Sequence, residues 1–175
     1  ENQWRFAHDK LRTALLTDLT ETERPALHQD VALTIEAVYP DDPVQAANLM
    51  NLWHIAGNSN KERRYAFQAG QYATQQFANT EAVAFLTRAY ALTPAREQMQ
   101  CFEILLVREQ VYALLGERGP QRQDLNQLTQ LADELAVQQV SDHRAVVALR
   151  LANYAEVTGE YSTAIFAAQN AIQLA

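Results

Sequence analysis

Apolar side chains recur every three or four residues along nearly the whole chain, which is the spacing of one face of an α-helix. Proline and glycine interrupt this pattern between runs of helical length. Glycine and proline number only five each among 175 residues, which is too few turn residues for an all-β fold. The pattern predicts an all-α chain with helices over residues 6–19, 22–38, 43–56, 61–76, 79–93, 95–115, 120–138, 142–158 and 161–174.

Two of the interrupting residues fall inside predicted helices. Pro25 lies in a first turn, where its missing N–H costs little. Gly70 lies in a helix interior, where glycine costs about 1 kcal/mol relative to alanine, so we expect a neighbouring helix to approach it closely. Every predicted loop is short, although the joint from Gly116 to Pro120 carries extra residues. Successive helices are therefore expected to pack antiparallel as hairpins.

Small residues recur with one spacing in two of these hairpins. The tetratricopeptide pattern is reproduced by Leu151, Ala152, Gly159, Tyr161, Ala164, Ile165 and Ala171. The same template is fitted one unit earlier by Ala69, Gly70, Ala82, Ala89 and Pro94. In this pattern small residues let paired helices approach closely, and an aromatic side chain fills the gap between them. Periodic hairpins of this kind bury their apolar faces only against their neighbours.

The pairing predicts hairpins over 61–93, 95–138 and 142–174, of which the middle one matches the template more weakly. The predicted fold is an all-α, right-handed α-solenoid of tetratricopeptide-like hairpins, with a compact helical bundle as the alternative. In this interpretation residues 1–58 are N-terminal helices that link to an upstream module, and residues 59–175 form the repeats.

Composition and charge narrow the classes of partner. The net charge is −7, the pI is about 5.0, and Lys and Arg form no cluster, which argues against nucleic acid or an anionic membrane as the main partner. No secretion signal or apolar membrane span is present, and Cys101 is the single cysteine, so we expect a cytoplasmic protein. The chain opens at Glu1 and closes within an apolar pattern, which predicts a piece of a longer polypeptide. The last helix is expected to expose an apolar edge that pairs in a homodimer or receives a further repeat.

Residues with catalytic chemistry do not form a recognisable set. None of the serines lies in a G-x-S-x-G turn, and Cys101 lies on an apolar helical stripe beside Phe102. The histidines lack the spacing of metal ligands; they are His8, His28, His54 and His143. Acidic pairs such as Asp41 with Asp42 precede helices, where they are expected to act as caps. We therefore expect no enzymatic activity, no metal and no cofactor in this chain.

Several segments of the chain share a resemblance: Phe6 to Arg12 with Leu15 and Leu16; Arg24, Leu27 and His28; Ala56–Gly57; Ala69–Gly70; Glu81–Ala82; Arg88–Ala89; and Arg108 to Gly116 with Gln121, Asp124 and Leu125. Together they resemble the helical region that follows the ATPase module in large bacterial signalling ATPases of the AAA and STAND types. These regulators often carry a nucleotide cyclase or a DNA-binding domain, with a tetratricopeptide-like array on the C-terminal side. The resemblance implies that any ATPase lies upstream of Glu1, because the chain has no G-x-x-x-x-G-K loop. It also includes His8–Asp9, which is either a contact with that module or a polar pair in a first helical turn.

These observations predict a protein-interaction or scaffold module that acts as the sensor or regulatory arm of a signalling ATPase. The alternative is an intramolecular regulator that gates the ATPase without an external partner. In a tetratricopeptide array the first helix of each hairpin lines the concave side, where a protein or peptide binds. The template positions that point into this groove are Arg64, Phe67, Gln71, Glu103, Leu106, Gln110, Asn153 and Glu156. Amides and apolar groups suit the hydrogen bonding of an extended or helical peptide, whereas gripping a carboxylate would need more than Arg64.

Overall fold

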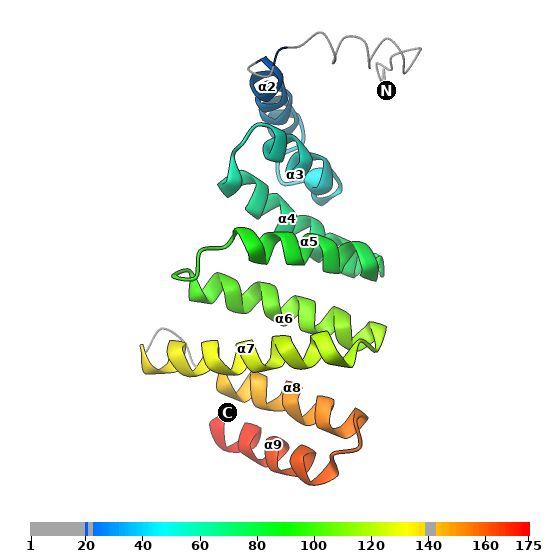
Figure 1. Ribbon diagram of the computed structural model, residues 1–175, viewed down its shortest axis with the longest axis vertical. Helices are drawn as coiled ribbons and strands as arrows, with labels where there is room; N and C mark the ends of the chain where they lie inside the picture. The colour runs from blue at the N-terminus through cyan, green and yellow to red at the C-terminus, as the bar shows by residue number, and fades with distance from the viewer. Residues whose placement is uncertain (1–19, 21–22, 139–142) are drawn as a thin grey trace.

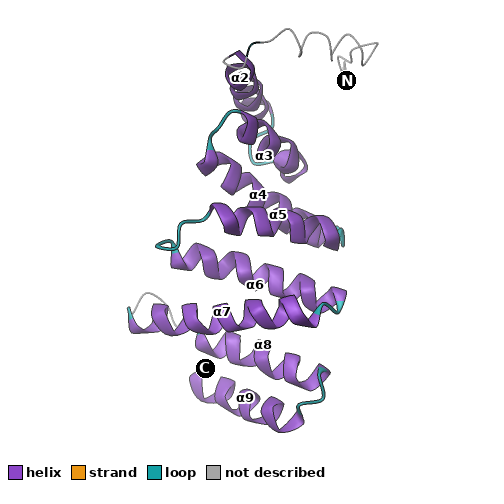
Figure 2. Ribbon diagram, in the orientation of Figure 1, coloured by secondary structure: helices purple, strands orange, loops and turns teal. Residues whose placement is uncertain are grey.

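The computed structural model describes residues 20, 23–138 and 143–175, so the predicted helix over 6–19 and the pair His8–Asp9 lie outside the described residues. Within the described part every regular element is helical, which confirms the all-α prediction (Figure 2). The elements are α2 (Glu23–Val38), the 3₁₀ turn η1 (Pro43–Gln45), α3 (Ala46–Ile55), α4 (Ser59–Gln75), α5 (Asn79–Leu92), α6 (Gln98–Leu115), α7 (Arg118–Val137), α8 (Arg144–Val157) and α9 (Tyr161–Leu174).

The helices stack in chain order along one long axis, with α2 near one end and α9 at the other (Figure 1). The most extensive packing lies between α4 and α5 and between α8 and α9. Buried apolar side chains form three clusters in series, one across α2 to α4, one across α4 to α6, and one across α6 to α8. A compact bundle would surround a single core, so the series of clusters argues against that alternative.

Helices α4 and α6 begin at residues other than the predicted ones, and local hydrogen bonds explain the differences. Helix α4 begins at Ser59, two residues early, because the side chain of Asn58 accepts a hydrogen bond from the backbone N–H of Lys61. Helix α6 begins three residues late, after a turn in which the N–H of Glu97 donates to the carbonyl of Pro94. Asp42 caps the turn η1 through Val44 N–H, as the acidic pair predicted.

The predicted long joint between α6 and α7 is wrong. Helix α6 ends at Leu115 and is capped by Gly116, whose φ of 73° is the left-handed conformation common at helix C-termini, and α7 begins at Arg118. Gly119 and Pro120 lie within the first turn of α7 rather than in the loop. A proline in the first turn loses no intrahelical hydrogen bond, which explains why the helix tolerates it.

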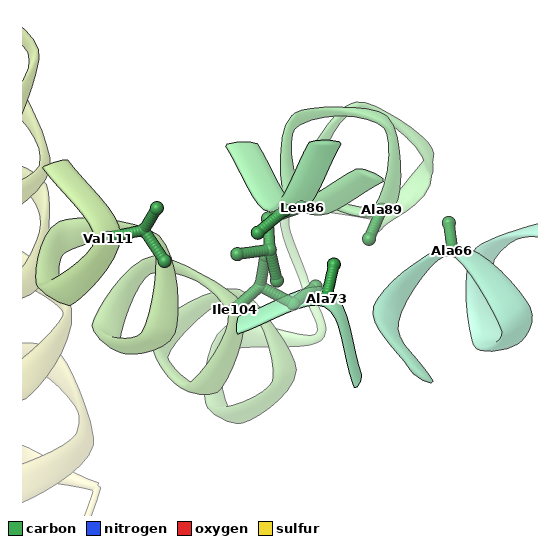
Figure 3. Close-up of a cluster of buried hydrophobic side chains, with 7 residues drawn as sticks. Ala66, Ala73, Leu86, Ala89, Ile104 and Val111 are labelled. Carbon is green, nitrogen blue, oxygen red and sulfur yellow. The ribbon is translucent and has the colours of Figure 1, made fainter. Parts of the chain in front are cut away.

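Gly70 lies at the close approach that the sequence predicted. A Cβ atom built on Gly70 would lie 2.6 Å from Cγ of Leu86, so α4 and α5 meet at this point with no room for a side chain. Around this contact, Ile104 and Val111 of α6 join residues of the two helices in one buried cluster (Figure 3). The cluster consists of Ala66, Ala73, Ala82, Leu86, Ala89, Ile104 and Val111. Small residues thus set the spacing of the first hairpin.

The hairpins α4/α5 and α8/α9 share one register. Helices α5 and α9 each have 14 residues and begin 82 residues apart, and α4 and α8 end the same 82 residues apart. This offset pairs Phe77 with Gly159, and both adopt left-handed backbone, with φ of 58° and 81°. Left-handed backbone suits glycine, whereas Cβ raises its cost in other residues. Phe77 is therefore strained, and its side chain, 81% exposed, buries little in return.

Phe77→Gly is expected to stabilise the chain, because glycine removes the left-handed strain at the turn between α4 and α5. The relief of about 1 to 2 kcal/mol is partly offset by the backbone entropy of glycine, which leaves a gain of about 0.5 to 1 kcal/mol in the free energy of unfolding. Urea denaturation measures the change. Phe77→Ala is the control, since it removes the ring and keeps the strain; an equal gain in that variant would place the effect in the ring instead.

Candidate functional site

The candidate site is a face built from the first helix of each hairpin. All of the predicted groove residues lie on α4, α6 or α8, and on each helix they are three, four or seven residues apart, so they share one side. Six are exposed: Arg64, Gln71, Glu103, Gln110, Asn153 and Glu156. We call the eight predicted positions on these three helices the first-helix face. Whether it is concave stays a prediction.

Phe67 and Leu106 are half-buried rather than freely exposed. Phe67 packs against the cluster that joins α4, α5 and α6, and Leu106 packs against the cluster that joins α6, α7 and α8. Each contributes an apolar edge to the face while most of the side chain stabilises the stack. A ligand would therefore meet apolar groups that are held in position by the core.

Arg64 has a partner within the chain. Its Nη2 donates to Oδ1 of Asp41 at 2.9 Å, and its guanidinium lies 5.5 Å from the ring centre of Tyr65. Asp41 stands at the turn before η1, with a φ of 56°. The pair is solvent-exposed, so it contributes little to stability and leaves the guanidinium accessible.

Sequence reasoning missed apolar positions that continue this face. Leu114 lies four residues beyond Gln110 on α6 and is 60% exposed. Leu149 lies four residues before Asn153 on α8 and is 53% exposed. The 82-residue register pairs Leu149 with Phe67, so the repeat spacing itself was the signal that would have found it. The face is thus more apolar toward α8 than predicted.

On the buried side of α6, Arg108 forms a bidentate ion pair with Asp124 of α7. The guanidinium donates through Nε and Nη2 to the two carboxylate oxygens of Asp124 at 2.9 and 2.7 Å, and through Nη1 to Thr87 at 3.2 Å. Burial would lower the pKa of Arg108, but the hydrogen bonds and charge of Asp124 outweigh it and raise that pKa. The pair fixes α6 against α7 while the contact with Thr87 reaches α5.

Glu109 continues this polar cluster toward α8. Its Oε1 accepts a hydrogen bond from Nε2 of Gln121 at 2.7 Å, and its Oε2 lies 3.4 Å from Nη1 of Arg150. Burial raises the pKa of Glu109, with the amide of Gln121 and the charge of Arg150 opposing that rise. The cluster of Arg108, Glu109, Gln121, Asp124 and Arg150, which we call the polar clamp, joins three helices. Gln110, the next residue on α6, is exposed.

A second polar anchor holds α2 to the stack. The carboxylate of Glu36 accepts hydrogen bonds from Nζ of Lys61 at 2.8 and 3.0 Å and from the indole N–H of Trp53 at 2.9 Å. Burial would raise the pKa of Glu36, but hydrogen bonds from Lys61, Tyr65 and Trp53 leave it below its usual value. Burial and the neighbouring Glu36 raise the pKa of Tyr65 to about 12. This anchor is structural, since its groups are mutually satisfied.

The side chains of Cys101 and His54 have reactive groups and lie within the part of the chain that the structure describes. Cys101 is 5% exposed, and burial raises the pKa of its thiol, which disfavours the reactive thiolate. His54 faces Glu62, with 3.2 Å between Nδ1 and Oε1, and Arg88 donates to the same oxygen at 2.6 Å. No group of three or more His, Cys, Asp or Glu side chains among the described residues is arranged to hold a metal ion.

No helix in residues 23–138 and 143–175 has the length and apolar character needed to cross a membrane. No family model matches the chain, and no curated protein sequence matches it. The likeness to signalling ATPases therefore stays a prediction from the quoted segments.

Proposed function

We propose that this chain is a protein-interaction module whose first-helix face binds an extended or helical peptide. The observation that carries the proposal is the outward stripe on α6, a helix otherwise enclosed by its neighbours, where exposed Glu103 and Gln110 flank half-buried Leu106. The same arrangement recurs on α4 with Gln71 beside Phe67. Amides that both donate and accept hydrogen bonds, set beside apolar edges, are suited to a peptide backbone and its apolar side chains.

Charge further defines the ligand. The ionised groups on the first-helix face are Arg64, which Asp41 already neutralises, and the acidic Glu103 and Glu156. The chain as a whole carries a net charge of −7. A neutral or basic peptide with a few apolar anchors is therefore favoured over an acidic one.

In this proposal the stacked hairpins are a right-handed, tetratricopeptide-like solenoid, and the first-helix face is its concave side. The shared 82-residue register of two hairpins and the close approach at Gly70 support that architecture. The role as the regulatory arm of a signalling ATPase rests on the resemblance alone. Gating of such an ATPase without an external partner is the alternative, and binding of this chain to the isolated ATPase module would favour it.

The test is selection of peptides from a displayed random library, followed by calorimetric titration of the selected peptides. The variant Gln71→Ser/Gln110→Ser/Asn153→Ser should weaken binding at least tenfold, because each lost amide leaves peptide polar groups unpaired. The control Gln123→Ser/Asn126→Ser/Gln169→Ser removes three exposed amides from α7 and α9 and should leave the affinity unchanged. Equal losses in both variants, or selection of no peptide, would contradict the proposal.

A further inference from the structure

The outer surface of the last hairpin is apolar and open. On α9 the side chains of Ile165 and Ile172 are 61% and 78% exposed, and on α8 Leu149 is 53% exposed. Between the two helices lies a hollow of about 320 Å³. It is lined by Leu149, Ala152, Asn153, Glu156, Tyr161, Ala164, Ile165 and Ala168. We call these eight residues, together with Ile172, the end face.

The first hairpin shows what covers such a surface. The 82-residue register pairs Ile165 and Ile172 with Val83 and Tyr90 of α5. Val83 and Tyr90 are half-buried and pack against the cluster that α6 completes. The equivalent positions on α9 lie in the open, and no described segment of the chain covers them.

The end face has both components of the contact that α6 makes with the first hairpin: projecting branched side chains and a surface of small residues. Where α6 packs on the first hairpin, Ile104 and Val111, seven residues apart, join a buried cluster that contains four alanines and Leu86 (Figure 3). The end face has its own branched side chains seven residues apart, Ile165 and Ile172, beside a hollow lined by Ala152, Ala164 and Ala168. A surface that contains projecting groups and matching hollows can pair with itself across a two-fold axis.

Electrostatics also favours a second copy on this surface. The chain carries a net charge of −7, so most contacts between two copies would be repulsive. Helix α9 contains no Asp, Glu, Lys or Arg. Glu156, near the end of α8, is the one ionised residue among those that line the hollow. Two end faces can therefore approach with little charge repulsion while burying apolar area.

We propose that two copies of this chain form a two-fold symmetric dimer through the end face, with Ile165 and Ile172 of each copy packed into the alanine-lined hollow of the other. The dimer goes beyond peptide binding and does not depend on it. Asn153 and Glu156 belong to both surfaces, so the α8 end of the first-helix face lies beside the dimer contact.

Sedimentation equilibrium over a range of concentrations tests the dimer. Ile165→Gln and Ile172→Gln should each raise the dimer dissociation constant at least tenfold, because each buries an amide without a partner where an apolar side chain packed. Both positions are exposed in a single copy, so thermal melts of the dilute protein should match wild type. Val137→Gln, at a position on α7 that is 84% exposed, is the matched control and should leave the dissociation constant unchanged.

Ala164→Arg supplies an independent test, because it fills the hollow and places a charge in each copy at the contact. It should abolish dimerisation while the amide variants at Gln71 and Gln110 leave the dimer intact. A chain that stays monomeric at every concentration would overturn the proposal and leave the end face to another occupant, such as a further hairpin. A dimer that Ile165→Gln, Ile172→Gln and Ala164→Arg leave unchanged would place the contact on another surface and overturn it equally.

Discussion

Asp124→Ala is expected to lower the free energy of unfolding by about 3 to 5 kcal/mol, because it leaves the guanidinium of Arg108 buried without its counter-charge. Asp124 is 2% exposed and Arg108 8%, so water cannot replace the lost carboxylate without opening the helix stack. Thr87 supplies only one neutral acceptor at 3.2 Å. The loss should be visible by urea denaturation followed by helical circular dichroism.

Two further variants separate the effect of burying an unpaired charge from the effect of losing an ion pair on the free energy of unfolding. Glu160→Ala breaks an ion pair in which Nη1 of Arg122 lies 3.7 Å from Oε1 of Glu160 and both side chains are about half exposed. It should lower the free energy of unfolding by less than about 0.5 kcal/mol. Arg108→Met/Asp124→Leu removes both buried charges and should recover most of the loss. If Asp124→Ala cost no more than Glu160→Ala, the polar clamp would not be a determinant of stability.

Gly70→Leu is expected to lower the free energy of unfolding by about 1 to 2 kcal/mol. The first added carbon alone would lie 2.6 Å from Cγ and 3.3 Å from the backbone N of Leu86, and overpacking of this kind costs about 1 to 3 kcal/mol. The gain in helix propensity, about 0.8 kcal/mol, offsets only part of it. Thermal and urea denaturation would both report the change.

Gly119→Leu is the control, because Gly119 also lies in a helix and nothing stands within 4 Å of its added Cβ. That variant should cost less than Gly70→Leu, because only the steric contact of leucine with the following Pro120 opposes it. A double-mutant cycle of Gly70→Ala with Leu86→Ala should give a coupling energy above about 1 kcal/mol, since shortening Leu86 relieves the clash. Additive effects would mean that α4 and α5 do not meet at Gly70.

The sequence predicted those features that depend on a local pattern. Helical periodicity placed eight of the described helices within a few residues of their observed ends, and the isolated glycine in an otherwise regular helix located the contact with Leu86. Helix ends shifted where a single side chain decided, as Asn58 did for α4. The prediction of a loop at Gly119 and Pro120 was wrong because the first turn of a helix tolerates both residues.

The polar clamp could not be predicted in the same way. Arg108, Glu109 and Asp124 look like ordinary surface charges along the chain, and only the stacking of α6 between its neighbours buries them together. The resemblance to signalling ATPases did include Arg108, Glu109, Gln121 and Asp124, but gave them no role. Of the candidate face, the spacing along each helix was available from the sequence, whereas the half-burial of Phe67 depends on contacts between hairpins.

The series of clusters has a consequence for how the chain loses structure. Each cluster joins consecutive helices, and none of the three includes a residue of α9, whose buried residues are the alanines Ala167 and Ala171. Opening α9 alone therefore disrupts none of the three clusters, whereas opening α6 disrupts two of them. Amide hydrogens of α9 should exchange with solvent through local opening, and those of α6 only when neighbouring hairpins separate as well. We therefore expect the amide hydrogens in the middle of the stack to exchange most slowly.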